Sequence, residues 1–109
     1  MRPGNYNPIM TTLPEPSETE WEEALAVLRR KQDSRYQADL DQIEFYELAQ
    51  KLLRTPDGRL RPGSRGQVER RLGVGSSLSR YIERSDTRQM RRDLEERRRE
   101  ELAARDGEP

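Results

Sequence analysis

The segment 66–84, GQVERRLGVGSSLSRYIER, constrains the fold most strongly because its apolar residues and glycines follow a regular pattern. Val68 and Leu72 lie four residues apart, and Gly73 follows at once. After Gly75, the apolar side chains that return at helical spacing are Leu78, Tyr81 and Ile82. The pattern predicts two short amphipathic helices joined by a tight glycine turn.

Upstream of this segment, a first helix is predicted over residues 18–32. Ser17 and Glu20 have the spacing of a capping box, in which two side chains satisfy free amides at the start of a helix. The apolar face of this helix consists of Trp21, Ala24, Leu25 and Leu28. Asp33 and Ser34 either end the helix or lie inside a longer one, and both alternatives stay open.

The next helix, predicted to end near Arg54, is the most apolar part of the chain. Its apolar residues are Tyr36, Leu40, Ile43, Phe45, Tyr46, Leu48, Ala49, Leu52 and Leu53. They cover more than one face, so we expect this helix to pack against the first helix and against either the basic segment or a second subunit. Residues 55–58, TPDG, predict a turn, and Ser64 with Gln67 predicts a second capping box.

The last helix is predicted to start at a cap formed by Ser85 or Asp86 and to run to about Ala104. Pairs of opposite charge four residues apart are expected to stabilise it by a few tenths of a kcal/mol each; they are Asp93–Arg97, Glu95–Arg99 and Glu101–Arg105. Its apolar residues are too sparse for a coiled-coil seam, which favours a solvated helix.

Together these elements predict an all-α protein with a helical hairpin, a helix-turn-helix unit and a charged C-terminal helix. The chain of 109 residues has room for one small domain. We expect a flexible N-terminal arm at 1–16, a helical domain at 17–92 with the helix-turn-helix at 64–84, and a charged helical tail at 93–109.

The composition excludes several kinds of chemistry. The chain has no Cys and no His, which removes disulfides, thiolate zinc sites and imidazole-based catalysis. Asp39, Asp41 and Glu44 lie close in sequence, but no further ligand has a spacing that would complete a metal site. The prediction is therefore a protein that is not an enzyme and uses no cofactor or metal.

The cellular location is predicted from the apolar segments of the chain. The longest apolar run, Ala24–Leu28, is far shorter than the ~20 residues that a membrane-spanning helix needs. The N-terminus lacks the apolar core of a secretory signal. No membrane partner is expected, and a cytoplasmic location is predicted.

The formal net charge of zero hides an uneven distribution. Residues 1–50 carry 5 basic and 10 acidic side chains, residues 51–92 carry 12 and 4, and residues 93–109 carry 4 and 7. The basic excess is thus confined to the segment with the glycine turn and favours a polyanion partner. All but two of the basic residues are Arg, which fits phosphate or guanine recognition as well as the codon bias of a GC-rich genome.

With this pattern of apolar residues, glycines and arginines, segment 64–84 resembles the helix-turn-helix of phage and bacterial repressors. The positions that match its core and turn are Val68, Leu72, Gly73, Val74, Leu78 and Ile82. The second half, SSLSRYIER, is similar to a recognition helix, which enters the major groove of DNA in those proteins. The resemblance implies a double-stranded DNA partner.

The resemblance also implies roles for individual side chains. The base contacts would come from Ser76, Ser77, Ser79 and Arg80. The phosphate contacts would come from Arg65, Arg70, Arg71 and Arg84. Two features depart from the family: Glu69 stands where a small residue is usual, and Val74 precedes Leu78 by four residues instead of five.

The predicted function is that of a small DNA-binding regulator, acting as a homo-oligomer such as a dimer. The alternative is a protein-interaction or assembly factor whose basic segment docks on a larger protein partner, such as a polymerase. Small terminase subunits of phages combine a helix-turn-helix with an oligomerising helix, and the chain is similar to them in outline.

Overall fold

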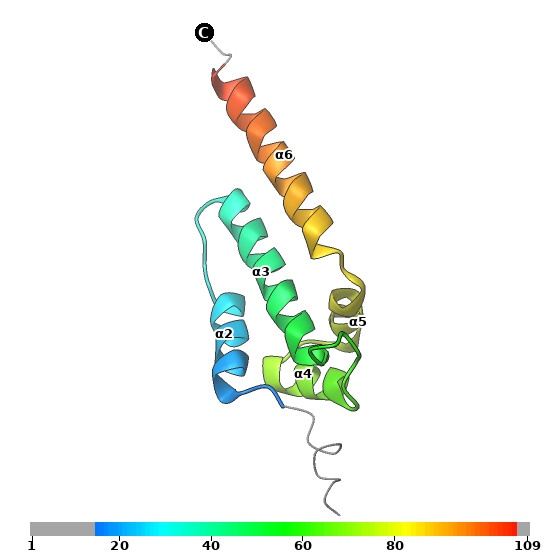
Figure 1. Ribbon diagram of the computed structural model, residues 1–109. Helices are drawn as coiled ribbons and strands as arrows, with labels where there is room; N and C mark the ends of the chain where they lie inside the picture. The colour runs from blue at the N-terminus through cyan, green and yellow to red at the C-terminus, as the bar shows by residue number, and fades with distance from the viewer. Residues whose placement is uncertain (1–14, 107–109) are drawn as a thin grey trace, which may run out of the picture.

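In the computed structural model, residues 15–106 are described, and this part of the chain is all-helical, as predicted. Its helices are α2 (Glu18–Leu28), α3 (Arg35–Leu53), α4 (Ser64–Leu72), α5 (Ser76–Arg84) and α6 (Thr87–Asp106) (Figure 1). Most of the predicted N-terminal arm and the last three residues of the predicted tail lie outside the described residues.

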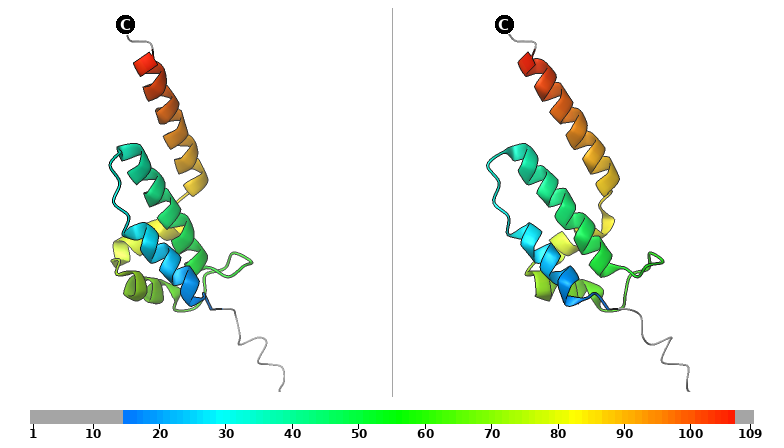
Figure 2. Two further views of the ribbon diagram at one scale, coloured as in Figure 1. Left: turned by 90° about the vertical axis from the view of Figure 1, so that its left-hand side faces the viewer. Right: turned by 60° about the vertical axis from the view of Figure 1, so that its left-hand side comes forward.

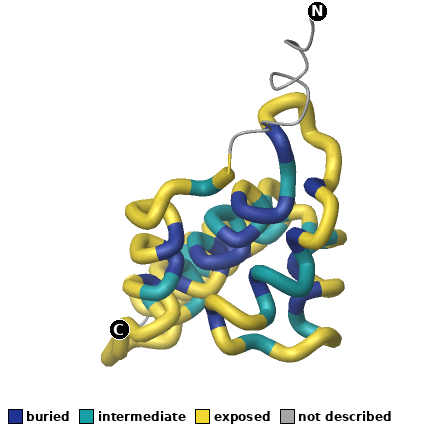
Figure 3. The backbone as a smooth tube through the Cα atoms, turned by 90° about the horizontal axis from the view of Figure 1, so that it is seen from below, coloured by how far each residue is buried: buried dark blue, intermediate teal, exposed yellow. Residues whose placement is uncertain are grey.

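Helix α3 is the centre of the fold. It packs against α2, α4, α5 and α6, and the views in Figure 2 show the other helices grouped around it. The core cluster consists of Trp21, Ala24, Val27, Phe45, Tyr46, Ala49, Leu52, Leu53, Val68, Leu72 and Ile82. In Figure 3 the buried segments face the interior of the molecule. The wide apolar surface of α3 is therefore covered by the first helix and by the basic unit within one chain.

The predicted first helix is too long, because α2 ends at Leu28. The capping box of Ser17 and Glu20 at its start is present. At its other end the chain leaves the helix and enters a loop that ends at Ser34, whose side chain caps α3 by accepting a hydrogen bond from the Gln37 amide. Residues 18–54 thus form two helices, which decides between the two alternatives that the sequence left open.

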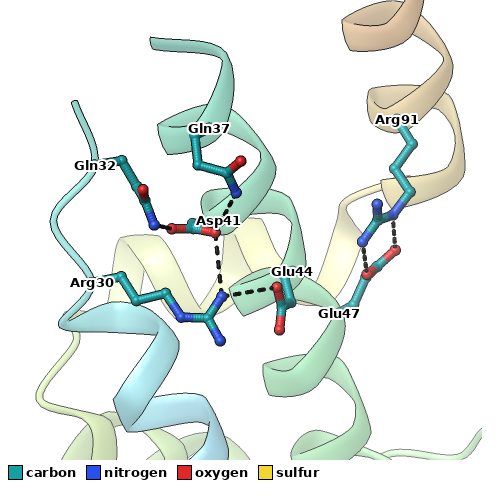
Figure 4. Close-up of polar contacts among 7 residues, drawn as sticks. All are labelled: Arg30, Gln32, Gln37, Asp41, Glu44, Glu47 and Arg91. Carbon is teal, nitrogen blue, oxygen red and sulfur yellow. Dashed lines mark hydrogen bonds and ion pairs between the residues drawn. The ribbon is translucent and has the colours of Figure 1, made fainter. Parts of the chain in front are cut away.

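A buried carboxylate explains where the loop between α2 and α3 runs. Asp41 of α3 accepts hydrogen bonds from Arg30 at 3.3 Å, from Gln32 at 2.6 Å and from Gln37 at 3.3 Å (Figure 4). Burial raises the pKa of Asp41, but these hydrogen bonds outweigh it and the pKa is lowered overall. Arg30 also donates to Glu44 at 3.2 Å. The α2–α3 loop is therefore held by tertiary contacts that compete with continuation of the first helix.

The predicted cap at Ser64 is wrong. The N-cap of α4 is Gly63, at φ 72°, without a side-chain cap bond, and Ser64 is buried as the first residue of the helix. The preceding turn is present, with Gly58 at φ 91° donating to the Thr55 carbonyl at 2.8 Å. A further backbone bond, from the Ser64 amide to the Arg61 carbonyl at 3.0 Å, carries the chain into α4. The left-handed conformation at Gly63 then turns the serine side chain toward the core.

Helix α6 packs against α3 and against no other helix of the described residues. Leu94 is its buried residue, and Arg91 binds Glu47 of α3 through two hydrogen bonds of 2.7 and 2.8 Å (Figure 4). The Asp86 side chain caps the helix by accepting from the Gln89 amide at 3.1 Å. Residues 99–106 are exposed. Apart from Leu94 and three half-buried residues, the rest of the helix is exposed as well, so most of α6 is solvated.

The three charge pairs predicted within α6 do not form ion pairs among the described residues. Instead, Glu95 accepts a hydrogen bond from Tyr36 at 2.6 Å, and Arg97 lies 3.9 Å from Asp39. Both partners belong to α3. The pairs Asp93–Arg97 and Glu95–Arg99 each lose one member to α3, whereas nothing in the structure explains the absence of the Glu101–Arg105 pair.

The contact between Glu47 and Arg91 predicts a pH dependence of stability. The hydrogen bond from Arg91 lowers the pKa of Glu47 below its ordinary value of 4.5, against the smaller opposing effect of burial. The contact therefore stabilises the folded chain above pH 4.5 and is lost as the pH falls through the lowered pKa. We expect Glu47→Gln to be less stable than wild type at neutral pH and to show a weaker fall of the free energy of unfolding in acid. Urea titrations of both proteins across this range measure the difference, and parallel curves would contradict it.

Candidate nucleic-acid interface

The two short helices predicted around the glycine turn are present. Helix α4 ends at Leu72, and Gly73 follows at φ 72°, a left-handed conformation that glycine adopts without strain. The amides of Gly73 and Val74 both donate to the Glu69 carbonyl, at 2.9 and 3.1 Å, and α5 begins after Gly75. The turn between the helices is thus three residues long and is closed by backbone hydrogen bonds.

The residues predicted to form the core of this unit occupy three kinds of position. Val68, Leu72 and Ile82 are buried. Val74 and Leu78 are partly buried and pack against the core cluster. Gly73 is exposed in the turn. Helix α5 is therefore held to the body of the protein by one face.

Glu69 and Ser79 form an interior contact that explains the departure from the family pattern. Ser79 is 0% exposed, and its hydroxyl donates to the Glu69 carboxylate at 2.6 Å. A carboxylate fits between the two helices because the facing side chain on α5 is a small serine that hydrogen-bonds to it. Ser79 is therefore removed from the predicted base contacts, since its side chain is buried. Its position three residues before Ile82, on the same helical face, is the sequence signal that indicates burial.

We predict that Ser79→Ala destabilises the protein by about 1–3 kcal/mol, because the partly buried Glu69 carboxylate loses a hydrogen-bond donor. Ser77→Ala is the matched control, since Ser77 is exposed on the same helix, and its effect should stay within about 0.5 kcal/mol. Chemical denaturation of both variants gives the comparison. Equal stabilities for the two variants would show that the Glu69–Ser79 contact contributes nothing.

The opposite face of α5 is open to solvent. Its exposed residues are Ser76, Ser77, Arg80, Tyr81 and Arg84. Tyr81, which has the spacing of a core residue, is 52% exposed and packs edge-on against Tyr46, with ring centroids 5.6 Å apart. Gly75 gives no side-chain cap, so the first amides of α5 point out of the helix at the positive end of its dipole.

The four arginines predicted to contact phosphate divide into two pairs. Arg65 binds both oxygens of Glu83 at 2.9 and 3.0 Å. Arg71 pairs with Glu18 at 2.5 Å and lies over the Trp21 ring, 4.7 Å from its centroid. These two guanidinium groups hold α4 to α5 and to α2.

Arg70 and Arg84, the other pair, are exposed, as is Arg80. Within residues 15–106, no carboxylate lies within ion-pair distance of any of the three. Glu83 is the only acidic residue of α5, and Arg65 neutralises it. The exposed face of α5 therefore carries an uncompensated positive charge beside its N-terminal serines.

A hollow of the described surface lies elsewhere. It has a volume of about 770 Å³ and is lined by the segment before α2 and the first turn of α2, the C-terminal half of α3 and the loop before α4, with no residue of α4 or α5. Three of its charged residues are already paired: Arg61 and Glu15 with each other at 3.1 Å, and Glu47 with Arg91 at 2.7 Å. The hollow thus includes none of the three arginines of α4 and α5, Arg70, Arg80 and Arg84, that lack an ion-pair partner within residues 15–106.

Over residues 15–106, no group of three or more Asp or Glu side chains is placed to hold a metal ion. In the same part of the chain, no helix is both long and apolar enough to cross a membrane. Comparison with known proteins found no match to a family model, to a curated protein or to a solved structure.

Proposed function

We propose that this chain is a non-catalytic, cofactor-free protein that binds double-stranded DNA through α4, the glycine turn and α5. One observation carries the proposal: α5 is anchored by its buried face and presents on its exposed face two arginines, Arg80 and Arg84, that have no ion-pair partner within residues 15–106. A helix held in this way matches the size of the major groove, which admits one α-helix. The role that fits is a small cytoplasmic regulator of transcription, acting as a dimer on two half-sites.

The side chains of α5 suit different parts of a DNA duplex. Arg80 has the planar fork that pairs with the two acceptors of guanine. Ser76 and Ser77 lie one turn before it at the N-terminus of the helix, where recognition helices meet base edges. Arg84 and Arg70 are assigned to phosphate. Arg65 and Arg71 are assigned to holding the fold, because their guanidinium groups are paired within the chain.

The alternative is a protein-interaction or assembly factor. Its supporting observations are the hollow of about 770 Å³, which is lined by no residue of α4 or α5, and the exposed Leu60 in the loop beside it. A protein partner recognised there would leave α5 free. The two functions are therefore distinguished by whether binding requires the charge of α5.

A titration of labelled random-sequence duplex DNA, followed by fluorescence anisotropy, tests the proposal. We expect binding at low salt that weakens with a log–log slope of about −2 or steeper, because Arg70 and Arg84 are each assigned to one phosphate and each neutralised phosphate contributes about −0.9. Duplex RNA of the same length should bind more weakly, since its narrow major groove excludes a helix. A labelled poly-glutamate peptide is the control for charge alone. No binding to DNA at low salt, or equally tight binding to the peptide, would contradict the proposal.

A further inference from the structure

The basic excess of α5 continues along the chain into the start of α6. Residues 76–92 contain five basic and two acidic side chains. Arg88 and Arg92 of α6 are exposed, and no carboxylate of the described residues lies within ion-pair distance of either. None of the roles considered so far uses these two arginines.

The carboxylates closest in sequence to Arg88 and Arg92 already have other partners. Asp86 accepts the hydrogen bond that caps α6. Asp93 accepts from the Gln89 side chain at 2.8 Å, and the same Gln89 side chain accepts from Arg92 at 2.7 Å. The bridge through Gln89 therefore positions the Arg92 guanidinium on the surface without neutralising its charge.

The arrangement of the helices keeps these arginines near α5. Arg84 and Arg88 are four residues apart, so their Cα atoms lie within about 15 Å of each other. Arg88 and Arg92 are one turn apart and share one side of α6, whereas Arg91 and Leu94 contact α3 or are buried. Beyond Arg92 the excess of basic over acidic side chains ends, because residues 93–101 hold five carboxylates and three arginines.

We propose that Arg88 and Arg92 form a second phosphate-binding surface, which holds the backbone of the same DNA duplex that α5 contacts. The inference rests on the proposed function and adds a sequence-independent contact outside the helix-turn-helix. Exposed guanidinium groups bind phosphodiester oxygens wherever the backbone passes, so they contribute affinity and position but no base discrimination. The ligand chemistry of this surface is the phosphodiester backbone of duplex DNA.

The test compares three double variants of the full chain, each losing two positive charges. Arg88→Gln/Arg92→Gln removes the α6 surface, and Arg80→Gln/Arg84→Gln removes the α5 contact. Arg29→Gln/Arg105→Gln is the matched control, because both residues are exposed and unpaired among the described residues. Thermal melts by circular dichroism establish that each variant is folded, and random and fixed-sequence duplexes are titrated at several salt concentrations.

We expect the α6 variant to bind both duplexes roughly tenfold more weakly at low salt, with a salt slope shallower by about 2. The Arg29→Gln/Arg105→Gln control should have the affinity and the salt slope of wild type. An α6 variant that keeps the wild-type affinity and salt slope overturns this inference. If the α5 variant in the same series binds DNA more weakly than wild type, the proposed function still stands. Absence of DNA binding by the wild type overturns both.

Discussion

Trp21→Ala is expected to lower the free energy of unfolding by about 3–5 kcal/mol, the range for removing a large aromatic side chain from a core. Trp21 is 1% exposed and belongs to the single core cluster formed by α2, α3, α4 and α5. Its ring also lies under the Arg71 guanidinium, so the substitution removes a cation–π contact between α2 and α4. In a chain of 109 residues this loss is a large fraction of a total of about 5–15 kcal/mol.

Thermal unfolding followed by circular dichroism measures the effect, and we expect the midpoint to fall by roughly 10–20 °C. Leu102→Ala is the control, because Leu102 is 40% exposed near the end of α6. Trp21→Phe keeps an aromatic ring in the core and should retain a cooperative transition at an intermediate temperature. A Trp21→Ala midpoint equal to that of Leu102→Ala would show that α2 is not part of the cooperative core.

Arg80→Gln/Arg84→Gln is expected to weaken binding to duplex DNA roughly 30-fold or more. A bidentate arginine–guanine pair contributes about 1–3 kcal/mol of discrimination, and loss of one phosphate contact makes the salt slope shallower by about 1. Neither arginine has an ion-pair partner in the described part of the chain. The substitutions should therefore leave the thermal stability unchanged.

Two further variants separate charge from geometry in the α5 contact. Arg80→Lys/Arg84→Lys keeps both positive charges but loses the planar fork. It should retain most of the affinity for random duplexes and lose discrimination between sequences. The Arg29→Gln/Arg105→Gln variant should bind like wild type. An α5 variant with the affinity of this control would refute the assignment of α5 as the DNA contact.

The local features of the fold could be predicted from the sequence because they depend on neighbours in the chain. The capping box at Ser17 and Glu20 needs only side chains three residues apart. The turn at Gly73 depends on a backbone conformation that favours glycine. Both are present where the pattern places them, and the helices on either side follow from the apolar spacing.

Apart from the cap at Ser64, which the neighbouring Gly63 decides, the errors in the fold arose where a distant residue decides the structure. The first helix ends early because Arg30 and Gln32 bind Asp41, which lies 9 to 11 residues further on. Within α6, Glu95 and Arg97 contact α3 instead of their neighbours. Sequence spacing alone cannot rank such tertiary partners against local ones.

The side chains predicted to contact DNA were also misjudged where tertiary partners decide their position. Of the side chains predicted to contact DNA, Ser79 is buried against Glu69, and Arg65 and Arg71 are paired with carboxylates. Whether an arginine is paired depends on which carboxylate the fold brings near it, as Glu18 is brought near Arg71 from 53 residues away. The remaining candidates are the ones that the fold leaves exposed and unpaired.

Amide chemical shifts of the isotope-labelled protein, titrated with duplex DNA at low salt, locate the contact surface most directly. The largest changes are predicted at Ser76, Ser77, Arg80 and Arg84, on the exposed face of α5. Glu15 and Glu20, which line the hollow beside Arg61 on its α2 side, should change little, because α2 makes no contact with α5. Changes confined to that hollow, or no changes at all, would contradict DNA binding by α5.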